Sequence, residues 1–71
     1  MSKRLSVRRR QTLFAVAATD GIASHRIATA LGAPAMSVRN ALTHLRNIGL
    51  VDYRGAWIVT LAGRQLVDAL K

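Results

Sequence analysis

The chain has 71 residues, with 11 Lys and Arg against 3 Asp and Glu, and a formal net charge of +8. A folded domain of this length buries only about 60% of the surface that its unfolded chain exposes, so it holds one small core and no large catalytic cleft. Hydrophobic residues make up 51% of the chain and aromatic residues 4%, a composition typical of packed helices that excludes disorder as the main state. Cys is absent, which excludes a disulfide framework, a thiolate zinc site and a thiol nucleophile.

The longest apolar run, Leu13 to Ala18, is far shorter than the roughly 20 residues that a membrane-spanning helix needs. The basic stretch before it, Arg8 to Arg10, has the order of an export signal, but Asp20 and Gly21 end the run too early. We therefore expect a single cytoplasmic domain over residues 1–71, with no membrane partner.

A basic N-terminal arm, over about residues 1–6, leads into the first predicted helix at 6–19. Ser6 is a possible N-cap, apolar residues recur at helical spacing, and Asp20-Gly21 supplies a stop. Residues 22–23 form a short extended piece.

Ser24 is expected to cap a second helix at 25–31, which ends at Gly32 in a left-handed conformation. A third helix follows from about residue 34 to 48, with Pro34 in its first turn and Gly49 at its end. Its buried stripe is expected to contain Val38, Ala41, Leu42 and Leu45. The connection between these helices is short and contains Gly32, as in a helix-turn-helix.

After Gly49 the apolar residues alternate, and two short β-rich runs, 50–54 and 57–60, predict a hairpin. Thr60 is expected to cap a last helix at 61–70, in which Gly63 is slightly unfavourable. The apolar side of this helix is expected to contain Leu66, Ala69 and Leu70. Tyr53 and Trp57 are expected to cover the core rather than to stack on a base. The predicted fold is therefore mainly α, with three helices, a two-stranded hairpin and a C-terminal helix.

Several segments together resemble the winged helix-turn-helix family of small bacterial and phage regulators. They are Ile27 to Gly32, Ser37 to Leu42 with Leu45, and Ile48 to Val51. The run from Trp57 to Gly63, in which a Thr and a Gly stand three apart, resembles the second wing strand and helix start of the MarR-type branch. The resemblance implies that the 34–48 helix enters the major groove, that the hairpin reaches a minor groove or the backbone, and that the first helix is a scaffold or dimer surface.

The outward side of the 34–48 helix suits base recognition. No acidic residue lies between Pro34 and Val51 to repel phosphates, and residues near the start of a recognition helix reach deepest. Arg39 is suited to guanine and Asn40 to adenine, while Met36 can touch a thymine methyl. The predicted base contacts are Met36, Ser37, Arg39, Asn40 and Thr43. The alternative is an ordinary solvated helix face.

Contacts with the DNA backbone or minor groove are predicted from basic and helix-start residues. Arg54, beside Gly55 at the expected wing tip, can enter a narrow minor groove. The first turn of the 25–31 helix, with Arg26, can hold a phosphate. The N-terminal cations can follow the backbone or enter the minor groove, or else form a solvated tail. The predicted set is Lys3, Arg4, Arg8, Arg9, Arg10, Ser24, Arg26, Arg46 and Arg54.

Catalysis and metal binding have few candidate groups. The chain contains no Glu, its Asp residues are scattered at positions 20, 52 and 68, and no Gly-rich phosphate loop is present. His25 and His44 have no nearby carboxylates in the sequence. We expect no enzymatic activity, no metal and no cofactor.

The sequence therefore predicts a nucleoid-associated, sequence-specific transcriptional regulator, of the repressor type, that binds double-stranded DNA. A single module reads few base pairs, so we expect a homodimer or cooperative assembly on DNA. The first and last helices, the latter through Leu66, Val67 and Leu70, are the candidate interfaces. The alternatives are a winged helix that binds a polymerase subunit or host factor, and an RNA-binding protein.

Overall fold

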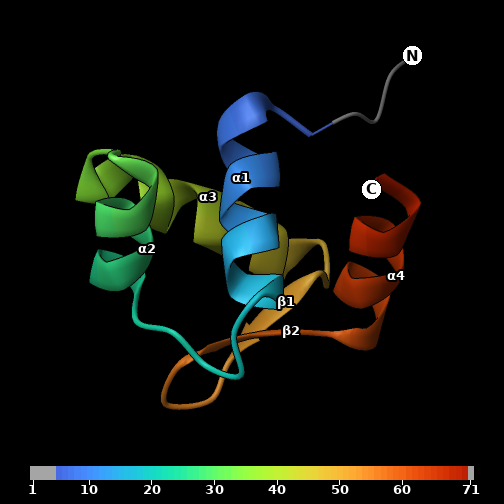
Figure 1. The fold of residues 1–71 in the computed structure, drawn as a ribbon. Helices are drawn as coiled ribbons and strands as arrows, with labels where there is room; N and C mark the ends of the chain where they lie inside the picture. Colours follow the sequence, from blue (N-terminus) through green and yellow to red (C-terminus); the bar gives the residue numbers. More distant parts are fainter. Residues whose placement is uncertain (1–4, 71) are drawn as a thin grey trace.

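The computed structural model describes residues 5–70, in which four helices pack together and a small two-stranded hairpin lies at one end of them (Figure 1). The element order is that predicted from the sequence. The helices are α1 (Val7–Ala17), α2 (Ser24–Leu31), α3 (Ala35–Asn47) and α4 (Leu61–Leu70), and the strands are β1 (Val51–Tyr53) and β2 (Trp57–Val59). Helix α1 packs against α3, while α2 and α4 lie on either side of it (Figure 1). None of the helices within residues 5–70 has the length and apolar character needed to cross a bilayer.

Helix α1 begins as predicted, because Ser6 is its N-cap. The Ser6 side chain accepts a hydrogen bond from the backbone N–H of Arg9 at 3.3 Å, which satisfies one of the free donors of the first turn. The helix ends at Ala17, earlier than the predicted residue 19.

Helices α2 and α3 are joined by the short turn that the sequence predicts. Gly32 is left-handed, with φ 62° and ψ 35°, and the Ala33 N–H donates to the Ala28 carbonyl at 3.0 Å. The prediction that Ser24 caps α2 is wrong, because Ala23 is the extended N-cap residue and no side chain caps the helix. Pro34 is likewise the extended N-cap of α3 rather than part of its first turn.

The hairpin is antiparallel, with Val51 opposite Val59 and Tyr53 opposite Trp57. Ile22, in the predicted extended piece, pairs with the outer side of β2. Its N–H donates to the Trp57 carbonyl at 3.1 Å, and the Trp57 N–H donates to the Ile22 carbonyl at 2.9 Å. The wing is therefore fixed to the connection between α1 and α2.

Thr60 and Gly63 attach α4 to the base of the wing. The Thr60 hydroxyl accepts from the Gly63 N–H at 3.1 Å and donates to the Gly49 carbonyl at 2.6 Å. A Cβ at Gly63 would collide with the carbonyl oxygen of Leu50. Gly63 is thus required for close packing, which outweighs the small helix penalty predicted for it.

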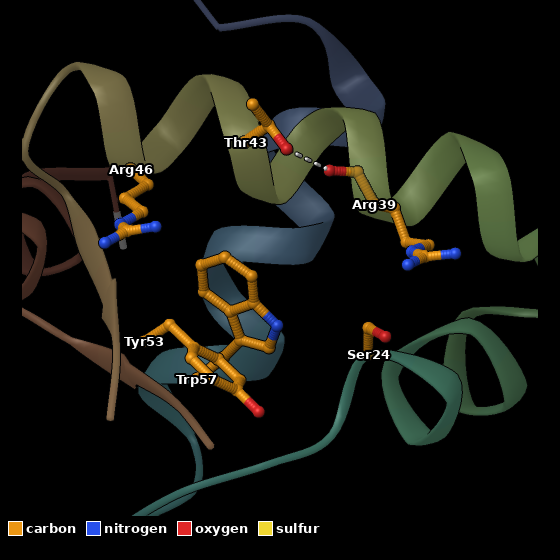
Figure 2. Close-up of a pocket in the computed structure, with 6 residues that line it drawn as sticks. All are labelled: Ser24, Arg39, Thr43, Arg46, Tyr53 and Trp57. Carbon is orange, nitrogen blue, oxygen red and sulfur yellow. Dashed lines mark hydrogen bonds between the residues drawn. The ribbon is translucent and has the colours of Figure 1, made fainter. Parts of the chain in front are cut away.

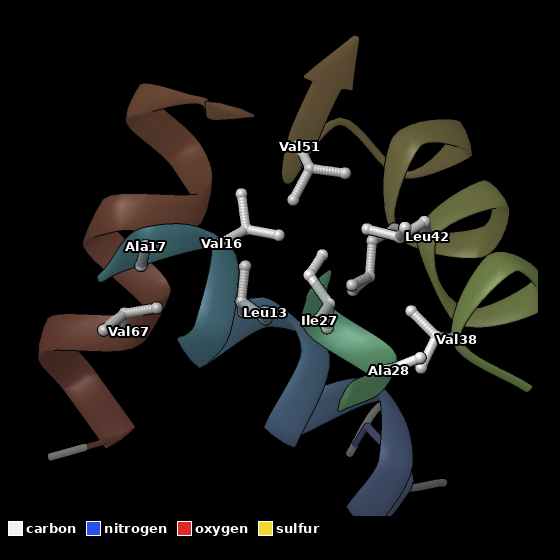
Figure 3. Close-up of a cluster of buried hydrophobic side chains, with 10 residues drawn as sticks. Leu13, Val16, Ala17, Ile27, Ala28, Val38, Leu42, Val51 and Val67 are labelled. Carbon is white, nitrogen blue, oxygen red and sulfur yellow. The ribbon is translucent and has the colours of Figure 1, made fainter. Parts of the chain in front are cut away.

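The core contains side chains from every helix and from β1. Its largest fully buried members are Leu13, Ile27, Leu42, Leu45, Val16, Val38 and Val51, most of which are drawn in Figure 3. The predicted stripe of α3 is buried in full, whereas the predicted side of α4 is only partly right, since Leu66 packs against the core but Ala69 and Leu70 are exposed. Val67 is 3% exposed, whereas Leu70 is 40% exposed, because Gly63 orients α4 and Val67 lies one turn further on the same face.

Candidate nucleic-acid interface

The outward side of α3 carries most of the predicted base-contacting residues. Met36 is 66% exposed, and Arg39, Asn40 and Thr43 are also exposed, whereas Ser37 is half-buried. The Thr43 hydroxyl donates to the Arg39 carbonyl at 3.0 Å (Figure 2). Its proton is therefore engaged within the helix, while its methyl group and oxygen lone pairs remain available to a ligand.

A cleft of about 360 Å³ lies along one flank of α3, between that helix, the start of α2 and the hairpin (Figure 2). We call it the wing cleft. Its lining residues are Ser24, Arg39, Thr43, Arg46, Tyr53 and Trp57. Two arginine side chains and two hydroxyl-bearing side chains of α2 and α3 thus face an aromatic wall.

The aromatic wall consists of Tyr53 and Trp57, which face each other across the hairpin. Their rings meet edge to face, with centroids 5.1 Å apart and planes at 62°. Trp57 packs against the core as predicted, while Tyr53 is 50% exposed. Trp57 therefore covers part of the core as predicted, whereas Tyr53 packs on the Trp57 ring and remains largely in solvent, contrary to the prediction that it covers the core.

Asp52 places a negative charge at the edge of the wing cleft. Its carboxylate pairs with the Arg54 Nε at 3.3 Å and with the Arg46 Nε at 3.6 Å. A hydrogen bond from the Tyr53 backbone N–H at 2.8 Å and one from the Arg54 side chain hold the Asp52 pKa below its ordinary value of 3.8. Asp52 therefore stays ionised at neutral pH and partly neutralises two of the predicted DNA-contacting arginines.

A smaller cleft of about 190 Å³ lies between the start of α1 and α3. We call it the α1 cleft. It is lined by Ser6, Arg8, Arg9, Ser37, Asn40 and Ala41. The first turn of α1 contains no acidic residue, and no carboxylate within residues 5–70 lies within salt-bridge distance of Arg8 or Arg9. Arg8 donates to the Gln11 side chain at 3.2 Å.

The two clefts divide the predicted site residues into two groups. Arg39, Thr43, Arg46 and Ser24 line the wing cleft, whereas Ser37, Asn40, Arg8 and Arg9 line the α1 cleft. The remaining predicted residues lie outside both clefts. Arg26 is exposed on α2, Arg54 is at the wing tip, Met36 is exposed on α3, and Lys3 and Arg4 fall outside the described residues.

Arg10 is half-buried like Arg8 and Arg9, but its Nε is buried without a hydrogen-bond partner among residues 5–70. Its position gives no support to the predicted backbone contact.

Sequence reasoning missed Asp52 as part of the site. A usable signal was present, because residues two apart on a strand point to the same side, and Asp52 and Arg54 have that spacing. Its pairing with Arg46 depends on the approach of β1 to the end of α3, which the local sequence does not specify.

A third hollow, of about 160 Å³, lies between α1 and α4 and is lined mainly by apolar groups. Phe14, Ala17, Ala18, Arg64 and Val67 surround it. The predicted α4 interface needs correction here, because Val67 is buried in the core rather than exposed. Within residues 5–70 as a whole, no group of three His, Cys, Asp or Glu side chains is placed to hold a metal ion.

Comparison with solved structures finds a similar fold in a known regulator. No protein-family model matches the sequence, and no curated protein matches it significantly. The crystal structure of a mutant of MepR, from a multidrug-resistant S. aureus clinical isolate, superposes with a TM-score of 0.86 at 28% sequence identity. MepR is a winged-helix regulator of the MarR family. The chain has a MarR-type winged-helix fold.

The match covers 93% of this chain and 54% of the MepR chain, so the chain spans about half the length of that protein. It confirms the predicted fold class and the MarR-type resemblance. Within the winged helix, α2 and α3 form the helix-turn-helix, and β1 and β2 form the wing.

Proposed function

We propose that this MarR-type winged helix is a sequence-specific transcriptional regulator that binds double-stranded DNA. In the proposed complex, α3 lies in the major groove and the wing contacts the backbone or the adjacent minor groove. The observation that carries the proposal is the exposed side of α3 between two arginine-lined clefts, in a chain of net charge +8.

The proposed base contacts come from the outward side of α3. Asn40 is suited to adenine and Arg39 to guanine, and the exposed thioether of Met36 to a thymine methyl. Thr43 contributes its methyl group and an acceptor, because its proton is bonded to the Arg39 carbonyl. Ser37 lies at the edge of this surface, in the α1 cleft.

The proposed backbone contacts come from both flanks. On the wing side they are Ser24, Arg26, Arg46 and Arg54, and on the α1 side they are Arg8 and Arg9, with Lys3, Arg4 and Arg10 as predicted from the sequence. Phosphate contacts of this kind fix the position of the protein but do not read sequence.

Regulation by one module of this size requires additional recognition. We propose that two copies bind paired half-sites, or that several copies assemble cooperatively, because one module reads few base pairs. The protein would act in the cytoplasm, on the nucleoid, as a repressor that occupies a promoter.

A salt titration tests the proposal. Binding to a duplex is measured by fluorescence anisotropy between 50 and 200 mM salt, and several phosphate contacts predict a loss of affinity of about 10³-fold over this range. Arg9→Ala should reduce the slope of log affinity against log salt by about 1. Arg64→Ala, which removes the same charge from α4, is the matched control and should leave the slope unchanged. A flat salt response would contradict the proposal.

The same measurements address two other functions. An interaction module that binds a protein through the apolar hollow between α1 and α4 predicts weak dependence on salt and no effect of Arg9→Ala. RNA binding predicts that a single-stranded or looped RNA competes better than duplex DNA.

A further inference from the structure

The two clefts on α3 are built from different parts of the fold, yet both combine arginines with small polar side chains. The wing cleft takes its arginines from α3 itself, and the α1 cleft takes Arg8 and Arg9 from the first turns of α1. Both clefts are open to solvent, since Arg39 and Asn40 are exposed.

The clefts lie on opposite flanks of α3. At 100° per residue, the wing-cleft residues Arg39, Thr43 and Arg46 fall on one side of the helix, and Ser37, Asn40 and Ala41 fall on the other. Met36 and Asn47 lie between the two groups, opposite the buried stripe of Val38, Leu42 and Leu45. A helix with this arrangement has an outward ridge and two basic flanks.

The major groove of B-form DNA has a matching arrangement. It is about 12 Å wide and admits one α-helix, which is about 10–12 Å across with its side chains. When the outward ridge of such a helix faces the groove floor, its two flanks face the phosphates of the two opposite strands. In that arrangement Arg8 and Arg9 of α1 lie at the edge of the major groove, beside one phosphate backbone, rather than in an arm directed to the minor groove.

From this geometry we infer that the α1 cleft and the wing cleft bind phosphates of opposite strands across one major groove. In this arrangement Arg8 and Arg9 contact one backbone and Arg46 contacts the other, while Arg39, on the same flank as Arg46, keeps its proposed base contact. The inference rests on the proposed function and specifies its geometry. It also assigns a role to α1, whose buried side contributes Leu13 and Val16 to the core and whose first turns would position the two arginines.

Strand-resolved phosphate ethylation interference tests the inference. The probe is the duplex of highest affinity selected from a random pool, labelled on one strand at a time. Wild-type protein should give interference on both strands, on the two sides of one major groove. Arg8→Gln/Arg9→Gln should abolish interference on one strand only, and Arg46→Gln should weaken it on the other strand only. Gln retains most of each side-chain stem, so packing changes little.

Controls separate charge from folding. Arg8→Lys/Arg9→Lys retains both charges and should keep the wild-type pattern, and Arg64→Gln should do the same. The Arg8→Gln/Arg9→Gln variant should lower the salt slope by about 2 and the affinity at least tenfold, with an unchanged far-ultraviolet circular dichroism spectrum.

The other outcomes contradict distinct claims. If Arg8→Gln/Arg9→Gln and Arg46→Gln reduce interference on the same strand, or if Arg8→Gln/Arg9→Gln leaves affinity and pattern unchanged while the duplex is still bound, the inference is overturned and the proposed function stands. If the wild-type protein binds no duplex from the pool, the proposed function and the inference are both overturned.

Discussion

The two flanks of α3 carry similar numbers of arginines but differ in what surrounds them. On the wing side, Arg46 and Arg54 both pair with Asp52. On the α1 side, no carboxylate within residues 5–70 lies within salt-bridge distance of Arg8 or Arg9. Among the described residues, phosphates must compete with the Asp52 carboxylate on the wing flank and with no such paired carboxylate on the α1 flank. A net charge of +8 therefore gives a poor measure of how much positive charge each surface offers.

Both flanks depend on the same hydrophobic core, so the largest expected loss of stability comes from a substitution that leaves a cavity in that core. Leu45 is fully buried on the inner side of α3, and Leu45→Ala should destabilise the fold by about 2 to 5 kcal/mol. Chemical denaturation measures the loss. Because α3 carries residues of both clefts, binding through the two flanks should decline together, and retention of either one would contradict a shared scaffold.

A smaller loss is expected from the attachment of the wing flank alone. In Gly63→Ala the new methyl group meets the Leu50 carbonyl and the Val59 side chain, so the junction of α4 with the hairpin must shift at a cost of about 3 kcal/mol. Amide chemical-shift changes should concentrate in α4, β1 and β2, and spare the start of α1. Gln65→Ala, on the exposed side of the same helix, is the control and should change stability by about 0.5 kcal/mol or less.

Asn40, which adjoins the outward ridge on the α1 side, should contribute to specificity. Asn40→Ala should relax the preference at one base position, at a cost of about 1 to 3 kcal/mol, because a bidentate contact with a base edge is lost. Selection from a random pool with wild type and variant measures the change. Asn47→Ala, near the end of α3, should have a smaller effect because residues near the helix start reach deepest. An unchanged motif with Asn40→Ala would contradict the assigned role.

Removal of the Asp52 charge should make the two flanks more alike in the positive charge that they offer to phosphates. Asp52→Asn retains an acceptor for the Tyr53 N–H but releases the charge of Arg46 and Arg54, so duplex affinity should rise about threefold to tenfold. The salt slope should also become steeper. Asp20→Asn removes the same charge from an exposed residue that lines neither cleft and should leave affinity unchanged. A fall in affinity with Asp52→Asn would mean that Asp52 positions the two arginines rather than neutralising them.

The smallest effect is on the titration of Asp52. Its pKa should lie below 3.8, chiefly through the Tyr53 N–H and then through Arg54. A lowered folded-state pKa means that the stabilisation is fully present above the unfolded-state value and is lost as pH falls through the folded-state value. A pH titration of the Asp52 carboxyl carbon by nuclear magnetic resonance measures this pKa. Arg54→Gln should raise the pKa part of the way toward 3.8. No change with Arg54→Gln would contradict the pairing.

Local sequence determines much of this fold. Ser6, Gly32 and Thr60 mark helix ends through single caps or a left-handed residue, and each prediction at these positions is confirmed. The prediction of a Ser24 cap is wrong because the extended N-cap residue is Ala23, one residue earlier in the chain, and its side chain makes no capping hydrogen bond. The side of α4 that is buried depends on the approach of Gly63 to Leu50, which involves segments distant in sequence.

The candidate site was predictable as a set of residues but not as an arrangement. Composition and the helix-turn-helix pattern identified the outward side of α3. The division of Asn40 from Arg39 between two clefts depends on where α1 and the wing lie against α3. The neutralising role of Asp52 depends on the approach of β1 to the end of α3.

Amide chemical-shift mapping with a selected duplex tests the central claim most directly. The account predicts that shifts concentrate on the outward side of α3, at Arg8 and Arg9, and along the wing cleft. It also predicts that the amide shifts of residues around the hollow between α1 and α4, such as Ala18 and Val67, do not change when a single protein molecule binds the duplex. Shifts centred on that hollow, with α3 unaffected, would contradict the account.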